Sequence, residues 1–398
     1  MKKILFVYFF AAAICLGSPA QRSPDLVGAD FRALEAMREK LRGGDGALVK
    51  DYALLLKKAD ETLVRPAESV IGGDVPPSGD RHDFFSIGKY AWPNPKTPDG
   101  MPYVRLDCKI NPESRGDRYD LGRLDKMFTR VGVLTRAWFY SGDEKYAAKS
   151  AEVLKVWFIN PETRMNPNFN FAAATPGVCD GMSAGIIFGS RFVSLVDCAK
   201  LLTLSKSWSA QDAAALKLWF GEYKKWLLES EFGTAEAKMR NNHGTWYYAQ
   251  VAAISLYVGD KSDAEKAAQA GKKCVADQVA KDGSFPRETR RMWALSYSVY
   301  SLRAFAALSA CSERAGVDLW HYKTEDGRGL QLAYEFLSPY ISGDKEWNKG
   351  VVRENEDPYK NAYPAFMNAA KKYDSPEFNA AVQKLKTDYP CVLTIEWF

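Results

Sequence analysis

The sequence predicts an all-α fold, a toroid or incomplete barrel of antiparallel helical hairpins with long loops at one rim. Apolar residues recur at spacings of three and four along most of the chain. Short turn signals separate consecutive helical segments, and hardly any segment shows the alternation of a strand. No repeat of fixed length is visible, so a regular solenoid is a less attractive interpretation.

The predicted helices follow one another from residue 25 to residue 385. In residues 25–42, Phe31, Leu34 and Met37 lie on one face, and residues 48–63 repeat the pattern. Residues 121–140 and 144–158 form a pair around the turn Ser141-Gly142-Asp143. The other predicted helices span residues 183–204, 210–228, 243–258, 262–279, 292–315, 329–341, 359–372 and 376–385. Ser209 with Asp212 indicates a helix start, and Gly259 indicates a helix end.

Two long segments interrupt the helices. Residues 72–113 contain seven prolines among aromatic and charged residues, and residues 160–180 contain Pro161, Asn166-Pro167-Asn168 and Pro176-Gly177. Long ordered loops of this kind usually carry function. No low-complexity tract or interdomain linker is visible, so we expect residues 21–398 to form one domain.

Residues 1–20 read as a secretory signal peptide. Lys2 and Lys3 precede an apolar run from residue 4 to residue 16, and small residues lead to a cleavage site near Ala20. Ile14 is too bulky for a lipoprotein signal at Cys15, so a lipid anchor is disfavoured. No later segment approaches the roughly 20 apolar residues of a membrane span. We expect a soluble exported protein, periplasmic or secreted.

The composition gives no reason to expect nucleic acid or a cofactor. Removing Lys2 and Lys3 with the leader lowers the formal charge from +5 to +3, so a polyanionic substrate would need a local basic cleft. The six cysteines after the leader are scattered and leave disulfide formation open. The three histidines share no short motif with cysteine or carboxylate clusters, so we predict no metal site.

The residues most informative about chemistry form two blocks. Asn241-Asn242-His243-Gly244-Thr245-Trp246 begins a predicted helix, and Pro286-Arg287-Glu288-Thr289-Arg290-Arg291 is followed by Tyr297. An amide, an imidazole, a guanidinium and a phenol can neutralise a sugar carboxylate and move a proton beside it. This combination favours a polysaccharide lyase.

With these residues the chain resembles the alginate-lyase superfamily over most of its mature length. The resemblance rests on the two blocks and on further motifs: His82-Asp83-Phe84-Phe85-Ser86, Tyr90-Ala91-Trp92-Pro93, Gly100-Met101-Pro102-Tyr103, Asn111-Pro112-Glu113 and Met165-Asn166-Pro167. It implies an (α/α) toroid that cleaves uronic-acid polymers by β-elimination. Members act on mannuronate-rich alginate, guluronate-containing alginate or glucuronan, and mannuronate-rich alginate is our first expectation.

The resemblance also implies roles for single residues. The family's Asn-His pair, which contacts the substrate carboxylate, corresponds to Asn242 and His243. Its Pro-x-Glu-x-x-Arg element corresponds to Pro286, Glu288 and Arg291, and its catalytic tyrosine corresponds to Tyr297. Arg290 is the alternative to Arg291. The chain departs from the family at Cys108, where relatives tend to have glycine after the aspartate.

Chemistry indicates how these groups would act. The C5 proton of a uronate is weakly acidic because the neighbouring carboxylate is already negative, so donors must first neutralise that carboxylate. On β-mannuronate, Tyr297 can serve as both base and acid, and Arg291 would favour its phenolate by lowering the tyrosine pKa. On guluronate, His243 could be the base and Tyr297 the acid.

Structural interpretations compete with these roles. The Asn pair could only cap a helix, Tyr297 and Tyr300 could be core residues, and the arginines could only form surface charge pairs or a bridge to Glu288. We predict substrate contact for five further residues, weighed against loop ordering or packing: Tyr90, Trp92, Trp246, Arg290 and Tyr300. His82 is expected to order its loop, with Asp83 and Ser86 as local partners.

Two other functional classes remain open. A glycoside hydrolase on the same toroid would need two carboxylates, for which Asp180 and Glu288 are candidates. A noncatalytic glycan-binding protein would bind oligosaccharide without turnover. The expected partner is an acidic polysaccharide, and the oligomeric state is left open.

Overall fold

The computed structural model describes residues 23–352 and 357–389. The predicted signal peptide, the predicted start of the mature chain and Cys391 therefore lie outside the described residues. Within the described ranges, no helix combines the length and apolar character needed to cross a membrane. Five cysteines of the described residues are free thiols: Cys108, Cys179, Cys198, Cys274 and Cys311.

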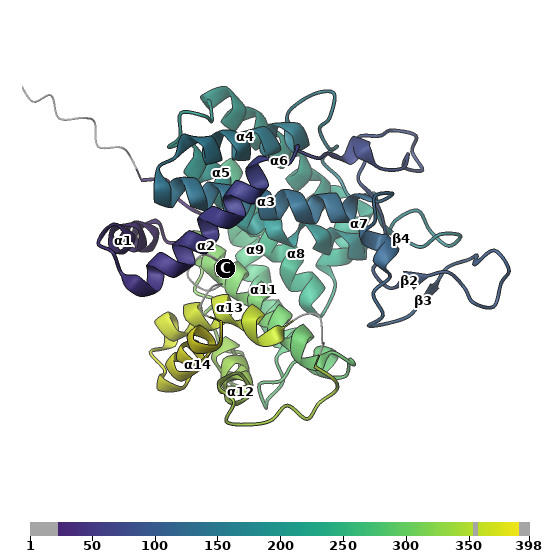
Figure 1. Ribbon diagram of the computed structural model, residues 1–398. Coiled ribbons are helices and arrows are strands. Elements are labelled where there is room, and N and C mark those ends of the chain that lie inside the picture. The colour runs from purple at the N-terminus through teal and green to yellow at the C-terminus, as the bar shows by residue number, and fades with distance from the viewer. Residues whose placement is uncertain (1–22, 353–356, 390–398) are drawn as a thin grey trace, which may run out of the picture.

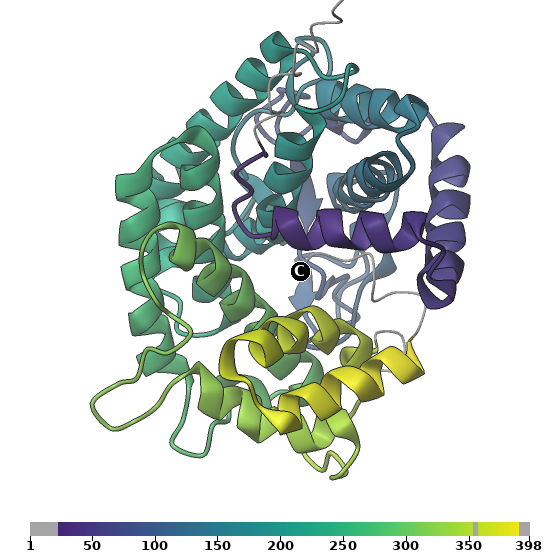
Figure 2. The same cartoon turned by 90° about the vertical axis from the view of Figure 1, so that its left-hand side faces the viewer.

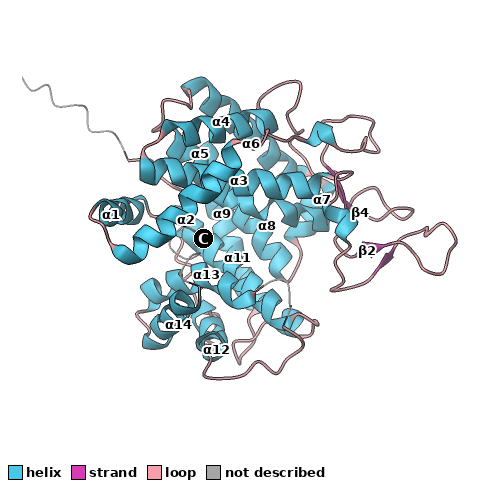
Figure 3. Ribbon diagram, viewed as in Figure 1, coloured by secondary structure: helices cyan, strands magenta, loops and turns pink. Residues whose placement is uncertain are grey.

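Helices make up nearly all of the regular structure (Figures 1 and 3). The α-helices are α1 (Phe31–Arg42), α2 (Gly46–Leu63), α3 (Asp120–Ser141), α4 (Glu144–Phe158), α5 (Phe192–Leu202), α6 (Ala210–Glu229), α7 (Glu231–Ala237), α8 (Asn242–Val258), α9 (Lys261–Gln278), α10 (Pro286–Thr289), α11 (Ala294–Arg314), α12 (Leu330–Ser342), α13 (Pro358–Tyr373) and α14 (Pro376–Asp388). Short 3-10 helices are η1 (Val70–Gly72), η2 (Pro112–Arg115) and η3 (Ser183–Arg191).

The helices pack as consecutive pairs arranged in a ring. α3 packs on α4, α8 on α9 and α13 on α14, while α11 contacts α8, α9 and α13. The view in Figure 2 shows these pairs surrounding a common centre. The buried apolar side chains form one contiguous cluster that runs through all of these pairs. The predicted all-α toroid is thereby confirmed.

Most predicted helix boundaries hold to within a residue or two. The helix predicted at residues 144–158 has those bounds, the predicted capping box of Ser209 and Asp212 is present, and Gly259 ends α8 with a φ of 90°. The first helix begins at Phe31 rather than at residue 25. In the segment before α1, the backbone N–H groups of residues 27–29 donate to the buried Asp197 carboxylate. These hydrogen bonds hold that segment in a conformation other than a helix.

Two predictions about helices were incomplete. The helix predicted at residues 183–204 is divided into the 3-10 helix η3 and the α-helix α5. Gly185 lets η3 pack closely against the segment that contains Ala172, because a Cβ at position 185 would lie 2.4 Å from the Ala172 side chain. The short helix α7 was not predicted at all, since its seven residues provide too little periodicity.

The two long loops meet through short strands. β1 (Phe85–Ile87) pairs in parallel with β4 (Phe171–Ala174), which joins the loop of residues 72–113 to that of residues 160–180. β2 (Ala91–Trp92) pairs antiparallel with β3 (Val104–Arg105). Figure 1 shows both pairs at one side of the helical body. The loops therefore form a common rim over that end of the toroid.

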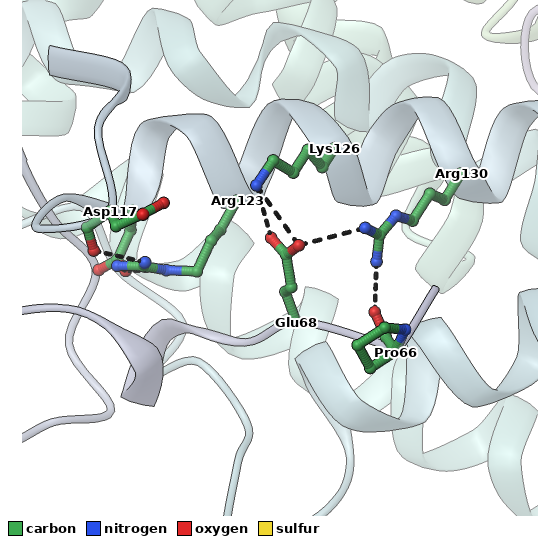
Figure 4. Close-up of polar contacts among 7 residues, drawn as sticks. Pro66, Glu68, Asp117, Arg123, Lys126 and Arg130 are labelled. Carbon is green, nitrogen blue, oxygen red and sulfur yellow. Dashed lines mark hydrogen bonds and ion pairs between the residues drawn. The ribbon is translucent and has the colours of Figure 1, made fainter. Parts of the chain in front are cut away.

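Ion pairs hold the start of this rim to α3 (Figure 4). Glu68 accepts hydrogen bonds from Lys126 and Arg130, and Arg130 also donates to the Pro66 carbonyl at 2.6 Å. Arg123 donates to the Asp117 carbonyl at 2.7 Å and to the Asp120 carboxylate. Asp120 in turn accepts the backbone N–H of Phe85 at 2.8 Å, so the first rim strand is positioned by α3.

Candidate active site

A cavity of about 740 Å³ lies where the rim loops meet the N-terminal ends of α8 and α11. Six of the nine predicted site residues line it: Asn242, His243, Arg291, Tyr297, Tyr90 and Tyr300. These residues come from three separate parts of the chain, and the fold brings them to one concave surface.

The lining of this cavity is basic. Lys89, Arg105, Arg115 and Arg291 contribute to it, and no aspartate or glutamate is among the described residues that do. The overall charge of the chain is modest, so this local excess of cations is a property of the cavity. The arrangement suits an anionic ligand.

The two asparagines at the start of α8 have different tasks. Asn241 is the N-cap, and its side chain accepts the backbone N–H of His243 at 3.2 Å. Asn242 is 1% exposed, and both its backbone N–H and its side-chain amide donate to Glu288 Oε1, at 3.0 and 2.7 Å. Helix capping therefore applies to Asn241, while Glu288 fixes the amide orientation of Asn242 in the cavity wall. A primary amide retains a second N–H for a ligand.

His243 is held from behind by a carboxylate that sequence reasoning missed. Its Nδ1 donates to Glu236 Oε1 at 2.6 Å, and Glu236 is 1% exposed. Glu236 lies on α7, the helix without a sequence signal, and it precedes His243 by seven residues. No pattern in the sequence links the two residues.

A glycine sets the start of α8. A Cβ added to Gly244 would lie 2.0 Å from the backbone oxygen of Met239, a distance that no side chain allows. Gly244 therefore lets the first turn of α8 approach the segment after α7. This approach places Asn242 and His243 at the cavity wall.

The predicted catalytic tyrosine is paired with a second phenol. The hydroxyls of Tyr297, on α11, and Tyr90, in the loop between β1 and β2, are 2.5 Å apart. The guanidinium of Arg291 lies over the Tyr297 ring, 3.5 Å from its centroid. The Tyr90 ring similarly faces the Arg105 guanidinium at 5.4 Å. Each phenol thus has a cation over its ring face.

The protonation of Tyr297 is set by opposing effects. Burial raises its pKa well above the ordinary value of 10, and the neighbouring Tyr90 acts in the same direction. Arg291 lowers the pKa, as predicted, but its effect is outweighed. The net effect of these surroundings favours the neutral phenol of Tyr297.

Asp107 joins the two guanidiniums. Its Oδ1 accepts from Arg291 Nη2 at 2.7 Å and from Arg105 Nη2 at 2.9 Å. Burial disfavours the Asp107 carboxylate, yet the two arginines hold its pKa below the usual value. Cys108 follows with a φ of 59°, the left-handed conformation that favours glycine.

Three predicted residues do not reach the cavity. Arg290 is exposed and is not among its lining residues, in contrast to Arg291. Trp92 instead donates its indole N–H to the Lys109 carbonyl at 2.8 Å. Trp246 is buried against the ring of Tyr300, with centroids 5.2 Å apart. Trp92 thus takes part in loop ordering and Trp246 in packing, while the substrate contacts predicted for the three residues stay predictions.

Other expectations also changed. His82 orders its loop as predicted, but through the Arg164 carbonyl and Asp80 rather than through Asp83 and Ser86. Neither arginine bridges to Glu288, whose carboxylate is engaged by Asn242. Four lining residues were not predicted as site residues: Lys89, Tyr103 and Arg105 of the proline-rich loop, and Arg115 just after it. Their position in a long ordered loop was the available signal.

Comparisons with known proteins give one consistent result. Residues 73–347 match the alginate lyase family. An alginate lyase of Pseudomonas syringae pv. tomato (strain ATCC BAA-871 / DC3000) is 33% identical over 110 residues, 27% of this chain and 29% of that protein. The matched region thus spans less than a third of that relative.

Solved structures extend the comparison over nearly the whole chain. The crystal structure of an alginate lyase from Bacteroides ovatus has a TM-score of 0.88 and 30% identity, covering 94% of this chain and 99% of that one. A variant of alginate lyase A1-III complexed with tetrasaccharide has a TM-score of 0.56 and 13% identity, covering 90% and 91%. The second likeness concerns the fold alone.

We predict that Gly244→Ala destabilises the protein, because its Cβ would overlap the Met239 carbonyl. The expected loss is about 1–3 kcal/mol of unfolding free energy, measured by denaturant titration. The matched control is Gly221→Ala within α6, where a Cβ would meet nothing within 4 Å. There the better helix propensity of alanine should add about 0.5–1 kcal/mol. Equal effects of the two substitutions would contradict the close approach.

Proposed function

The chain belongs to the alginate lyase family, and on that premise we propose that it is a polysaccharide lyase. The proposed reaction is β-elimination in a 1,4-linked uronic-acid polymer, with mannuronate-rich alginate as the first substrate. The observation that carries the proposal is that Asn242, His243, Arg291 and Tyr297 line a single cavity. An amide, an imidazole, a guanidinium and a phenol can there act on one sugar residue.

The cations of the cavity support an acidic polymer as substrate. A polyuronate carries one carboxylate on every sugar, so a bound chain presents several negative charges in a row. Lys89, Arg105 and Arg115 lie in the cavity wall in addition to Arg291. The cavity volume of about 740 Å³ falls within the range of ordinary ligand sites.

The first step is neutralisation of the carboxylate beside C5. The free N–H of Asn242 and a protonated His243 can donate to it, and Arg291 adds positive charge. Each hydrogen bond to a charged acceptor contributes about 1.5–3 kcal/mol. These donors become more important as negative charge accumulates on the sugar in the transition state.

Tyr297 then moves the proton. Its phenolate takes the C5 proton, the C4–O bond breaks as the C4–C5 double bond forms, and the resulting phenol protonates O4 of the leaving sugar. One residue can do both because C5–H and O4 of β-mannuronate lie on the same face. Arg291 favours the phenolate against the effect of burial. The hydroxyl of Tyr90, 2.5 Å away, can donate a hydrogen bond to that phenolate.

A glycoside hydrolase is less well supported. Such enzymes act through two carboxylates that flank the bond to be cleaved. Among the described residues that line the cavity there is no carboxylate, and Asp180 is not one of them. Glu288 is 2% exposed and lies behind Asn242. The site therefore favours elimination over hydrolysis.

We further propose that the protein acts after export, as the leader sequence indicates.

We predict that Tyr297→Phe abolishes turnover but leaves binding largely intact, since only the proton carrier is removed. Turnover is followed by ultraviolet absorbance of the new C4–C5 double bond, with poly-mannuronate, poly-guluronate and glucuronan compared side by side. Binding of a mannuronate oligosaccharide is measured by calorimetry. Release of sugar ends without the absorbance would favour hydrolysis, and full activity of Tyr297→Phe would exclude the assigned role.

We predict that Arg291→Gln moves the pH profile of the reaction upward. The base is the phenolate of Tyr297, so kcat/KM rises with pH, and loss of the guanidinium raises the tyrosine pKa further. At neutral pH the loss should be about 10²–10³-fold, typical for one transition-state donor. Arg290→Gln is the matched control because Arg290 is exposed outside the cavity. If the pH profile moved upward in Arg290→Gln but not in Arg291→Gln, the role would belong to Arg290 instead of Arg291.

A further inference from the structure

Glu236 is a buried carboxylate with very little around it to compensate its charge. It is 1% exposed, its Oε1 accepts from His243 Nδ1 at 2.6 Å, and its Oε2 has no hydrogen-bond partner. Among the described residues, no lysine or arginine forms an ion pair with it. Burying a carboxylate with one partner is costly. The burial of Glu236 therefore gives it little stabilising value of its own.

The fold aims Glu236 at His243 through a close approach of backbones. The Ser230 side chain caps α7 by accepting the N–H of Gly233 at 3.0 Å. A Cβ on Gly233 would lie 1.9 Å from the Leu227 carbonyl, so only glycine lets α7 turn so tightly against α6. Glu236 then lies one turn later, beneath the first turn of α8. The contact thus depends on the backbone path of three successive helices.

This contact determines which nitrogen of His243 carries the proton. A carboxylate can only accept, so the neutral imidazole must carry its proton on Nδ1. Nε2 then has a lone pair and no proton. A neutral His243 can therefore accept a proton at Nε2 but cannot donate from it, and it donates there only as an imidazolium. An unrestrained imidazole would instead prefer the proton on Nε2.

We propose that Glu236 is a positioning residue for His243: its buried carboxylate holds the imidazole proton on Nδ1 and presents Nε2 to the cavity. The effect of this contact on turnover rests on the proposed function, whereas its effect on the tautomer of His243 does not. With Glu236 in place, the imidazolium and carboxylate form a neutral pair in which Nε2–H can bind the uronate carboxylate. Without Glu236, the neutral imidazole would carry its proton on Nε2, and the carboxylate that favours the imidazolium donor would be gone.

The test is direct observation of the tautomer by two-bond ¹H–¹⁵N NMR correlation at alkaline pH. The chain contains only three histidines, so the spectrum is simple, and His82→Gln and His321→Gln assign it. His82 is an internal standard, because its Nδ1 lies 2.6 Å from the Arg164 carbonyl, which fixes the proton on Nδ1. We expect His243 to show the same pattern, a pyrrole-type Nδ1 and a pyridine-type Nε2.

Glu236→Met removes the acceptor and keeps an apolar side chain of similar length. The imidazole left behind can be neutral, so the substitution leaves no unpaired buried charge and the variant should keep its fold, which its melting temperature checks. We expect the His243 proton to move to Nε2. We also expect kcat to fall about 10–100-fold, as for loss of other partners that orient a histidine, with KM changed much less.

Asp318→Ala is the matched control. Asp318 holds Nδ1 of His321 at 2.8 Å in the same way, but both side chains are exposed and lie outside the cavity. The substitution removes a carboxylate from a histidine without touching the site. We expect the signals of His243 and the value of kcat to stay unchanged.

The outcomes separate this inference from the proposed function. A His243 that carries its proton on Nε2 in the unaltered protein, or that keeps it on Nδ1 in Glu236→Met, would overturn the positioning role. An unaltered kcat in Glu236→Met despite a changed tautomer would also overturn it. If the unaltered protein has the expected tautomer but cleaves no polyuronate, the proposed function fails while the assignment of the Glu236 contact stands.

Discussion

The site depends on how the first turn of α8 is held. Asn242 and His243 are neighbours in sequence, and each is fixed by a different buried glutamate, Glu288 and Glu236. Gly244 permits the backbone approach that brings the turn into position. These constraints leave one N–H of the amide and one edge of the imidazole for a ligand. The two glutamates do not line the cavity, because they hold Asn242 and His243 from behind. A cavity suited to an anion thus depends on two buried carboxylates that orient its donors.

The second half of the site is supplied by the rim. α3 positions β1 through Asp120, and the loop after β1 brings Tyr90 to within 2.5 Å of Tyr297. Asp107, which follows β3 in the same proline-rich segment, accepts hydrogen bonds from both Arg291 and Arg105. The proline-rich segment therefore contributes a phenol, a cation and the carboxylate that orders the cations. Helices provide the fixed donors, and the loop provides the groups that surround the proton carrier.

Sequence reasoning predicted the helical class and most helix boundaries because amphipathic periodicity and caps are local features. It predicted Asn242, His243, Arg291 and Tyr297 as site residues because they stand in ordered motifs, and all four line one cavity. It could not predict Glu236, since α7 is short and its contact with His243 depends on a backbone approach at two glycines. It also placed Trp246 and Trp92 ambiguously, because an aromatic side chain has the same signature in a core and in a sugar site.

The central claim is that one carboxylate of an acidic sugar meets the α8 donors while its C5 faces Tyr297. The most direct measurement is a crystal structure of the Tyr297→Phe protein with a bound mannuronate tetrasaccharide. The account predicts a C6 carboxylate within hydrogen-bond distance of Asn242 Nδ2 and His243 Nε2, with the C5 hydrogen directed at the edge of the substituted ring, where the tyrosine hydroxyl had been. A sugar bound with its carboxylate away from both donors, or outside the cavity, would contradict it.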